Sequence, residues 1–218
     1  RKGLTHDELE TFLHELGHVF HGVLTQTEYL AHAGTSVKRD FVEAPSQMFE
    51  EWARSPQTLK KIPEFCDNCP ALDNSTIERL NAARNFGRGV DYSRQHLYAS
   101  FDMRLAGENP EPSLATWYEM EGATPIGALP EGQFPGAFGH IAGGYAAGYY
   151  GYMWSEVLAI DMLSAFGNNL MDPKVGKRFR DIILGEGGQR PPKELVTEFL
   201  KRAPNPAAFF AEITGNGK

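Results

Sequence analysis

Residues 14–18 read His-Glu-Leu-Gly-His, and this short run limits the possible folds of the chain more than any other feature of its sequence. On an α-helix, residues four positions apart lie on the same face, so His14 and His18 can bind one metal ion together if the segment is helical. Thr5 and Glu8 have the spacing of a capping box, which begins a helix. The sequence therefore predicts a helix that starts there, ends near residue 22 and presents two imidazoles to a metal.

Glu15 stands beside the first of these histidines and adds a possible base. A zinc ion lowers the pKa of a bound water to roughly 7, so that a nearby carboxylate can remove a proton near neutral pH. The pattern thus predicts a hydrolytic zinc site with Glu15 as general base. Only three of the five residues are fixed by the pattern, however, and a solvent-exposed helical face with two histidines is the alternative.

A hydrolytic zinc site of this type needs a third protein ligand. Glu43 is the strongest candidate, because it lies on a second expected helix that Asp40 would cap. Asp40, Glu50 and Glu51 compete with it for this role. Gln47 and Glu50 lie one and two turns beyond Glu43, so either could accept the free N–H of a ligand histidine.

The composition of the chain narrows its possible partners. The chain has 218 residues, 41% of them hydrophobic, which is enough for one globular domain over 1–218. Its formal net charge is −7 and it has no basic stripe, so we expect no nucleic-acid partner. The apolar stretches are too short for a membrane span. Cys66 and Cys69 cannot form a disulfide framework, and we expect two free thiols in a loop and a cytoplasmic location.

Helical signals dominate the remainder of the chain, so the predicted fold class is mainly α with at most a small β element. Thr27 to Ala31 is the only strand candidate. Surface connections rich in Gly and Pro are expected at Glu108–Pro112 and Glu121–Pro135. Helices are expected over Asp40–Arg54, Ser75–Phe86, Ser93–Leu105, Tyr150–Phe166, Asp172–Leu184 and Asn205–Ile213.

Several separated segments together resemble one known family. The metal motif at 14–18, Gly34-Thr35, the run Asp40 to Gln47 and the Gly-rich run His140 to Glu156 are similar to the thimet oligopeptidase family, which includes neurolysin, oligopeptidase A and bacterial dipeptidyl carboxypeptidase. Two C-terminal segments, 178–188 and 199–210, also look like the end of that family. Family members are several times longer, so the resemblance implies a helical zincin-type catalytic domain that matches their C-terminal portion, with an N-terminal portion missing.

The resemblance also implies roles for individual residues. Glu43 matches the third metal ligand, completing a site for one Zn²⁺ per chain. His140 and Tyr152 match residues that stabilise the tetrahedral intermediate or bind substrate, and Tyr145 and Tyr149 would line the same cleft. A phenol or an imidazole N–H can donate to a carbonyl oxygen that gains negative charge, which makes these roles chemically reasonable. The alternative is that these aromatic residues simply flank a packed helix.

The activity implied by this resemblance is that of a zinc metalloendopeptidase acting on short oligopeptides. Two departures from the family pattern bear on specificity. Leu16 replaces the usual Phe, and Ala146-Ala147 is nearer to the dipeptidyl carboxypeptidase version of the loop than to that of the mammalian endopeptidases. Release of C-terminal dipeptides is therefore an open alternative. A truncated zinc-binding helical module with little activity is another, because the family members are longer.

Overall fold

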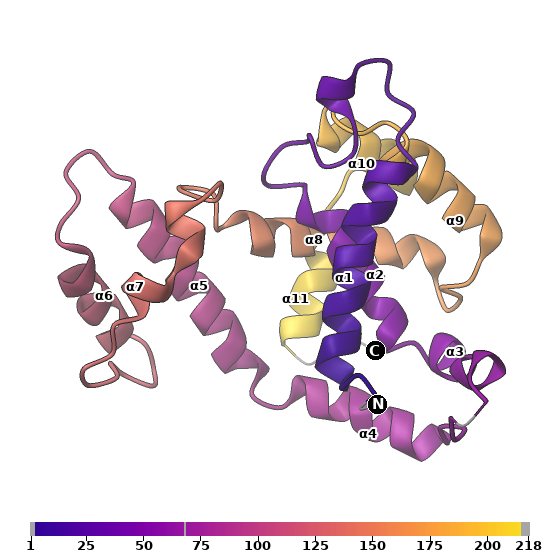
Figure 1. Ribbon diagram of the computed structural model, residues 1–218, viewed down its shortest axis with the longest axis horizontal. Coiled ribbons are helices and arrows are strands. Elements are labelled where there is room, and N and C mark those ends of the chain that lie inside the picture. The colour runs from indigo at the N-terminus through magenta and orange to yellow at the C-terminus, as the bar shows by residue number, and fades with distance from the viewer. Residues whose placement is uncertain (1–2, 68, 215–218) are drawn as a thin grey trace. The chain divides into compact units, whose positions relative to one another are not determined.

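The computed structural model describes residues 3–67 and 69–214, and these residues form helices and connecting turns without a strand (Figure 1). The prediction of a mainly α fold is therefore confirmed. The α-helices and the short 3₁₀ or π segments (η) are, in chain order, α1 (His6–Val23), η1 (Leu30–His32), α2 (Glu43–Glu50), η2 (Glu51–Ala53), α3 (Pro56–Leu59), η3 (Ile62–Phe65), α4 (Asn74–Asn85), α5 (Arg88–Leu105), α6 (Ser113–Gly122), α7 (Phe134–Ala137), η4 (Gly139–Ala142), α8 (Gly151–Leu163), η5 (Ser164–Phe166), α9 (Pro173–Phe179), η6 (Arg180–Leu184), α10 (Pro192–Leu200) and α11 (Ala207–Ile213).

Helix α1 begins as its sequence predicts. The Thr5 hydroxyl accepts the backbone N–H of Glu8 at 3.2 Å, and the Glu8 carboxylate accepts the backbone N–H of Thr5 at 2.7 Å. This capping box satisfies two N–H groups that the first turn of a helix leaves without an intrahelical partner. The helix then runs without a break to Val23, so His14 and His18 lie one turn apart on the same face.

Helix α2 begins at Glu43, and the prediction that Asp40 would cap it is wrong. The backbone N–H groups of Phe41 and Val42 both bond to the carbonyl of Lys38 at 3.0 Å, so the residues before Glu43 form a turn. The turn places Phe41 in the core, with no exposed surface, and burial of that ring favours the later start. Glu43 is thereby the first helical residue.

The predicted strand at Thr27 to Ala31 is also wrong, because the second half of that segment is the 3₁₀ helix η1. A strand needs a neighbouring strand for its backbone groups, and the described residues contain none. The N–H groups of His32 and Ala33 bond locally instead, to the carbonyls of Tyr29 and Leu30 at 3.0 Å.

Two backbone hydrogen bonds, together called the backbone seam, join the segment that follows α1 to the segment between η6 and α10. The N–H of Gln26 bonds to the carbonyl of Gly185, and the N–H of Gly188 bonds to the carbonyl of His32, both at 2.8 Å. Gly187 has a φ of +48°, and a Cβ there would collide with the His32 carbonyl oxygen. The two backbones can therefore approach this closely only where the later segment has glycine.

The chain divides into two compact units. Unit 1 comprises the described parts of Arg1–Phe86 and Trp154–Lys218, and unit 2 comprises Gly87–Met153. The core of unit 1 joins residues from both of its chain segments, with Phe41 and Met48 from the first and Met162, Ile183 and Phe199 from the second, all without exposed surface. Burying each of these side chains contributes about 1.5–3 kcal/mol to folding.

Unit 2 has its own smaller and more aromatic core. Leu97 and Phe101 of α5 pack with Trp117 of α6 and with Phe138 and Tyr149 from the later, Gly-rich part of the chain. The Phe101 ring meets the Trp117 ring edge to face, with the centroids 5.2 Å apart. Helix α6 was not predicted, because Gly- and Pro-rich segments flank it closely.

Smaller features of unit 1 correct or confirm other sequence predictions. The helix expected from Ser75 begins at Asn74 instead, and Asp73 caps it by accepting the N–H of Thr76 at 2.7 Å. Asp172 caps α9 as expected, accepting the N–H of Lys174 at 2.8 Å.

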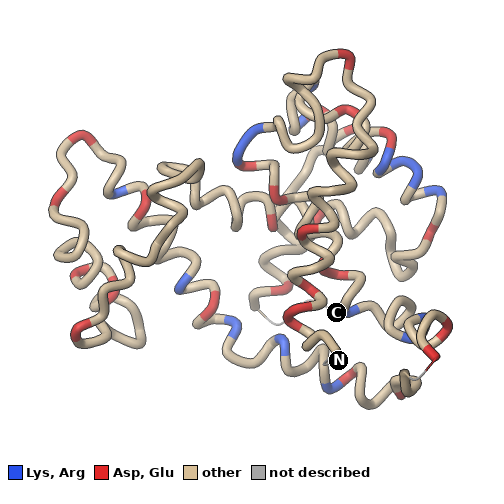
Figure 2. Tube along the Cα trace, in the orientation of Figure 1, with Lys and Arg blue, Asp and Glu red and all other residues tan. Residues whose placement is uncertain are grey.

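The prediction of two free thiols is wrong, because Cys66 and Cys69 form a disulfide. Basic residues follow one another along α9 and η6 (Figure 2), where two of them contact Asp181.

Candidate active site

Helices α1 and α2 pack closely against each other, and Gly17 makes this approach possible. A Cβ atom at Gly17 would lie 2.6 Å from the Cα of Ser46 and 3.3 Å from the carbonyl oxygen of Pro45, closer than packed carbon atoms come. Only glycine allows the two backbones to approach in this way. The approach turns the histidine face of α1 toward the first turn of α2.

Three side chains converge across this contact. The Nε2 atoms of His14 and His18 lie 3.2 Å and 3.1 Å from the same carboxylate oxygen of Glu43. One ligand atom from each of the three residues lies within 4.8 Å of the other two. Among the described residues, Glu43 joins the two histidines in this group, and the competing Asp40, Glu50 and Glu51 do not. Two imidazole nitrogens and one carboxylate oxygen are the donor set of catalytic zinc sites that keep a position open for water, so this group fits zinc.

Contacts around the group fix its members in place. Glu43 is buried, with 2% of its surface exposed, and its carboxylate accepts the Ser46 hydroxyl at 3.2 Å. The Nδ1 atom of His14 lies 2.6 Å from a carboxylate oxygen of Glu50. Of the two candidates for this contact, Gln47 and Glu50, the structure therefore selects Glu50. An Nδ1–H bond to a carboxylate leaves Nε2 free for a metal and orients the ring.

The two carboxylates also change the pKa of His14 in the metal-free chain. Burial lowers this pKa, but hydrogen bonds to Glu43 and Glu50 outweigh it, and the pKa rises from 6.5 to about 9. A metal must displace this proton, because a histidine ligand binds in its neutral form. Metal binding at this group is therefore coupled to pH.

Two other polar residues of α1 differ in their surroundings. Glu15, which follows His14 in the sequence, is exposed. His21 has no exposed surface, and its pKa is lowered to about 4 by burial and then by the nearby His18. It lies outside the group of possible ligands, in agreement with a packing role rather than a fourth ligand.

The tyrosines of the Gly-rich segment form a cluster around His140 in unit 2. The Tyr152 hydroxyl lies 3.4 Å from the Nε2 atom of His140. The Tyr145 ring stacks on the Tyr152 ring, with the centroids 5.1 Å apart. Tyr149 is buried, and its hydroxyl donates to Gln95 at 3.1 Å. Burial also raises the pKa of Tyr149 to about 12, so it remains a neutral phenol in solution. His140 is exposed and Tyr152 half-buried, so both remain accessible to a ligand.

Comparison with known proteins decides the family. The family model for peptidase family M3 matches residues 3–215. The chain belongs to peptidase family M3. It is 39% identical to the thimet-like oligopeptidase of Dictyostelium discoideum over 96% of its length, and 38% identical to oligopeptidase A of Escherichia coli over 92%. It is also 33% identical to the dipeptidyl carboxypeptidase of Salmonella typhimurium over 91%. These M3 relatives support a peptidase function.

The chain spans about a third of the length of these M3 relatives, namely 32%, 31% and 30% of the three proteins. The match of the family model to residues 3–215 confirms, over most of this chain, the family resemblance seen in the separate motifs. No helix among the described residues has the length and apolarity needed to cross a membrane.

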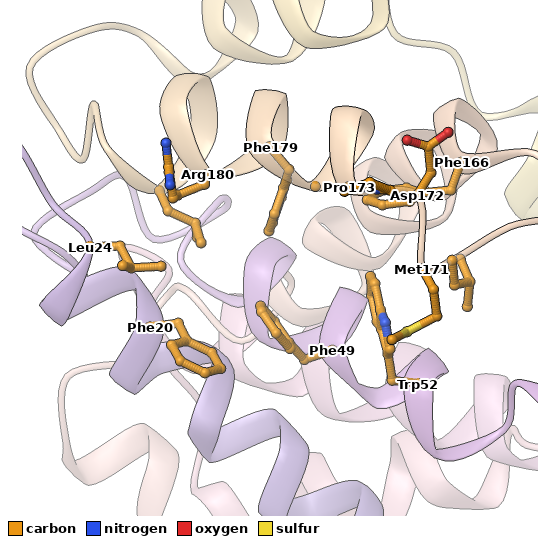
Figure 3. A pocket seen from close by; sticks show the side chains of 13 residues that line it. Phe20, Leu24, Phe49, Trp52, Phe166, Met171, Asp172, Pro173, Phe179 and Arg180 are labelled. Atoms are coloured by element: carbon orange, nitrogen blue, oxygen red, sulfur yellow. The ribbon is translucent and has the colours of Figure 1, made fainter. Parts of the chain in front are cut away.

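A pocket of about 330 Å³ lies beside α1, α2 and α9 (Figure 3). Phe20 of α1, Phe49 of α2 and Phe179 of α9 line it, together with Trp52. It contains none of the proposed metal ligands of this M3 chain. Its walls include Phe20, Phe49 and Trp52, which pack against the core of unit 1.

Sequence reasoning missed one residue near the tyrosine cluster, Asp102 of α5. Its carboxylate is buried and accepts the backbone N–H groups of Ala147 and Tyr149. A signal was available, since Asp102 shares a helical face with the aromatic Tyr98 and the apolar Leu105. A carboxylate at an apolar position of a helix indicates a specific partner, because a buried charge must be hydrogen-bonded.

Proposed function

We propose that this chain is the catalytic part of a zinc peptidase that hydrolyses short oligopeptides, with His14, His18 and Glu43 as ligands of one Zn²⁺. The observation that carries the proposal is the convergence of both histidine Nε2 atoms on a single buried Glu43 oxygen. Glu50, which contacts the other nitrogen of His14, supports it, because catalytic zinc sites orient their histidines in this way.

The chemistry divides between the bound ion and the side chains. Zinc, when bound, supplies Lewis-acid polarisation and lowers the pKa of water. Glu15 takes a proton from the attacking water and delivers it to the leaving amine. Tyr152, together with His140, donates to the carbonyl oxygen as it gains negative charge. Tyr145 and Tyr149 belong to the same cluster, and we propose that they contribute to the peptide-binding surface, Tyr149 through its packing.

Names of the M3 relatives include both oligopeptidases and a dipeptidyl carboxypeptidase. We propose endopeptidase action on short peptides as the main activity. Dipeptide release is the second candidate, favoured by Ala146-Ala147 in the Gly-rich segment.

Metal content and cleavage of matched peptides test this proposal together. The parent protein should hold one zinc ion per chain, and His14→Ala should lose it. His32→Ala removes a histidine of η1 that lies outside the ligand group, so its zinc content should match that of the parent. Full zinc in His14→Ala would refute the ligand assignment.

The same peptide, with free or blocked termini, separates the two activities. An endopeptidase should cut both forms at one internal bond. A dipeptidyl carboxypeptidase should release a dipeptide from the free C-terminus and spare the form blocked there. A zinc-loaded parent that cuts neither form would contradict the peptidase proposal for this chain and leave a zinc-binding helical module.

A further inference from the structure

Asp102 stands out in unit 2 because it is buried, with 2% of its surface exposed, and both of its oxygens bind the backbone of the Gly-rich segment. One oxygen accepts the N–H of Ala147 and the other accepts the N–H of Tyr149, each at 2.9 Å. Hydrogen bonds to an ionised carboxylate are about twice as strong as bonds between neutral groups. The carboxylate therefore holds two points of the segment at once.

Asp161, the other buried aspartate among the described residues, shows why the partners of Asp102 are unusual. Asp161 is also 2% exposed, but it pairs with the guanidinium of Arg202 and accepts the backbone N–H of Asn205. Asp102 has no lysine or arginine partner among the described residues, and Arg104 on the same helix binds Glu111 and Glu119 instead. The backbone of the Gly-rich segment thus takes the place of a cation.

The held backbone has a conformation that needs support. Ala147 has a φ of +54°, in the left-handed region that residues with a Cβ seldom adopt. Such a conformation persists only where surrounding contacts impose it, and such positions cluster at functional sites. The bond from the Ala147 N–H to Asp102 is a contact of this kind, made at the strained residue itself.

The bonds pass from Asp102 to the tyrosine cluster in two short steps. Tyr149, held by Asp102, accepts the N–H of Tyr152 at its carbonyl at 3.2 Å, so it fixes the start of α8. The Tyr149 ring also contacts the rings of Tyr152 and His140, with centroids 5.1 Å away in both pairs. The position of the Tyr152 hydroxyl therefore depends on where Asp102 holds the segment.

We propose that Asp102 is a positioning residue, whose carboxylate holds the Gly-rich segment so that Tyr152 and His140 present their polar atoms to the substrate carbonyl. This inference rests on the proposed peptidase function. Asp102 itself touches no reacting atom, and its effect passes through Tyr149 to Tyr152.

Asp102→Asn tests the inference, with Asp161→Asn as the matched control. The amide keeps one acceptor and turns an N–H₂ group toward the second backbone donor, so one bond is lost. We expect kcat to fall by up to about 100-fold, the cost of misplacing a reacting group by about an ångström, with KM and zinc content near those of the parent. Asp161→Asn should change the thermal midpoint but leave kcat within a few-fold of the parent.

A double variant distinguishes positioning from general damage. If Asp102 acts through Tyr152, then Asp102→Asn should cost almost nothing further in a Tyr152→Phe protein, because the effects of groups that act as one unit do not add. Additive losses in kcat would overturn the positioning role. So would an Asp102→Asn protein with the kcat of the parent.

Amide hydrogen exchange followed by NMR gives a readout that needs no activity. In the parent, the amides of Ala147 and Tyr149 should be protected, and Asp102→Asn should speed their exchange while Asp161→Asn leaves it unchanged. Exchange at the rate of an open chain in the parent would overturn the inference, even if Asp102→Asn does not fold. A parent with protected amides and no peptidase activity would instead refute the proposed function, which separates the two failures.

Discussion

The candidate metal group of unit 1 and the tyrosine cluster of unit 2 are built in opposite ways. His14, His18 and Glu43 lie on regular helices, and the packing of α1 against α2 brings them together. Tyr145 and Tyr149 lie on an irregular, Gly-rich segment that depends on a carboxylate from another helix. The comparison shows that a helix can position a side chain through its own periodicity, whereas an irregular segment is also held by a partner elsewhere in the chain.

The largest expected effect is a loss of turnover in unit 1, and it separates the role of Glu15 from that of the three proposed metal ligands. Glu15→Gln keeps the shape of the side chain but cannot take a proton, so turnover should fall by about 100- to 10,000-fold. Zinc content should not change, since Glu15 is exposed and is not one of the three possible ligands. Steady-state kinetics and elemental analysis of the same sample measure both. Turnover within about threefold of an active parent would rule out the general-base role.

A smaller loss is expected from the corresponding change in unit 2. Tyr152→Phe removes the hydroxyl near His140 and should lower kcat by about 100- to 1,000-fold, the cost of one oxyanion donor in a well-studied protease. KM should change little, because the bond forms only after the ground state. Full Michaelis curves for the parent and the variant give both constants. A normal kcat with a raised KM would make Tyr152 a residue that binds the ground state.

Removal of the metal should make the stability of unit 1 depend on pH. The pKa of His14 in the folded, metal-free chain is about 9, above the unfolded value of 6.5. The stabilisation is therefore fully present below pH 6.5 and is lost as pH rises through 9, by about 3 kcal/mol in total. Urea unfolding in the presence of a chelator at several pH values in this range measures it. In His14→Gln this component should be absent, and a parent curve identical to that of the variant would contradict the assigned contacts.

The smallest expected effect tests the close approach of α1 and α2. Gly17→Ala places a methyl group against the backbone at Ser46, so the helices must separate, at a cost of about 1–3 kcal/mol. Zinc affinity should fall as well, because the same shift moves the two histidines away from Glu43. Gly22→Ala, on the same helix, meets nothing within 4 Å and should be neutral or stabilising by up to about 1 kcal/mol. Equal stability and zinc affinity in the two variants would show that the approach is not limiting.

The sequence predicted those parts of the fold and site that depend on local rules. The capping box at Thr5 and the spacing of His14 and His18 sufficed to predict α1, and the resemblance to the family indicated Glu43. The start of α2 was predicted wrongly because burial of Phe41 outweighs the capping preference of Asp40. Such a choice depends on tertiary packing, which local propensity does not contain.

The contacts between distant segments were beyond local rules. Nothing near Asp102 in the sequence indicates that its partners are the N–H groups of residues 147 and 149, because those donors belong to the backbone and have no side-chain signature. The segment after α1 was wrongly predicted as a strand because its hydrogen-bond partners are also backbone groups without a side-chain signature. Its partner is the backbone near Gly185 and Gly188, which lies more than 150 residues later in the printed sequence.

The backbone seam between these two segments has a consequence for the order in which the protein can fold. Unit 2 is one continuous stretch, and all of its core residues are available once Met153 has left the ribosome. Unit 1 is not, because the segment that follows the metal helix has its backbone partners at Gly185 and Gly188. Contacts over so long a separation form late, since the loop between them must be closed first. The segment that follows the metal helix thus gains its backbone partners only after residues 185–188 have been made.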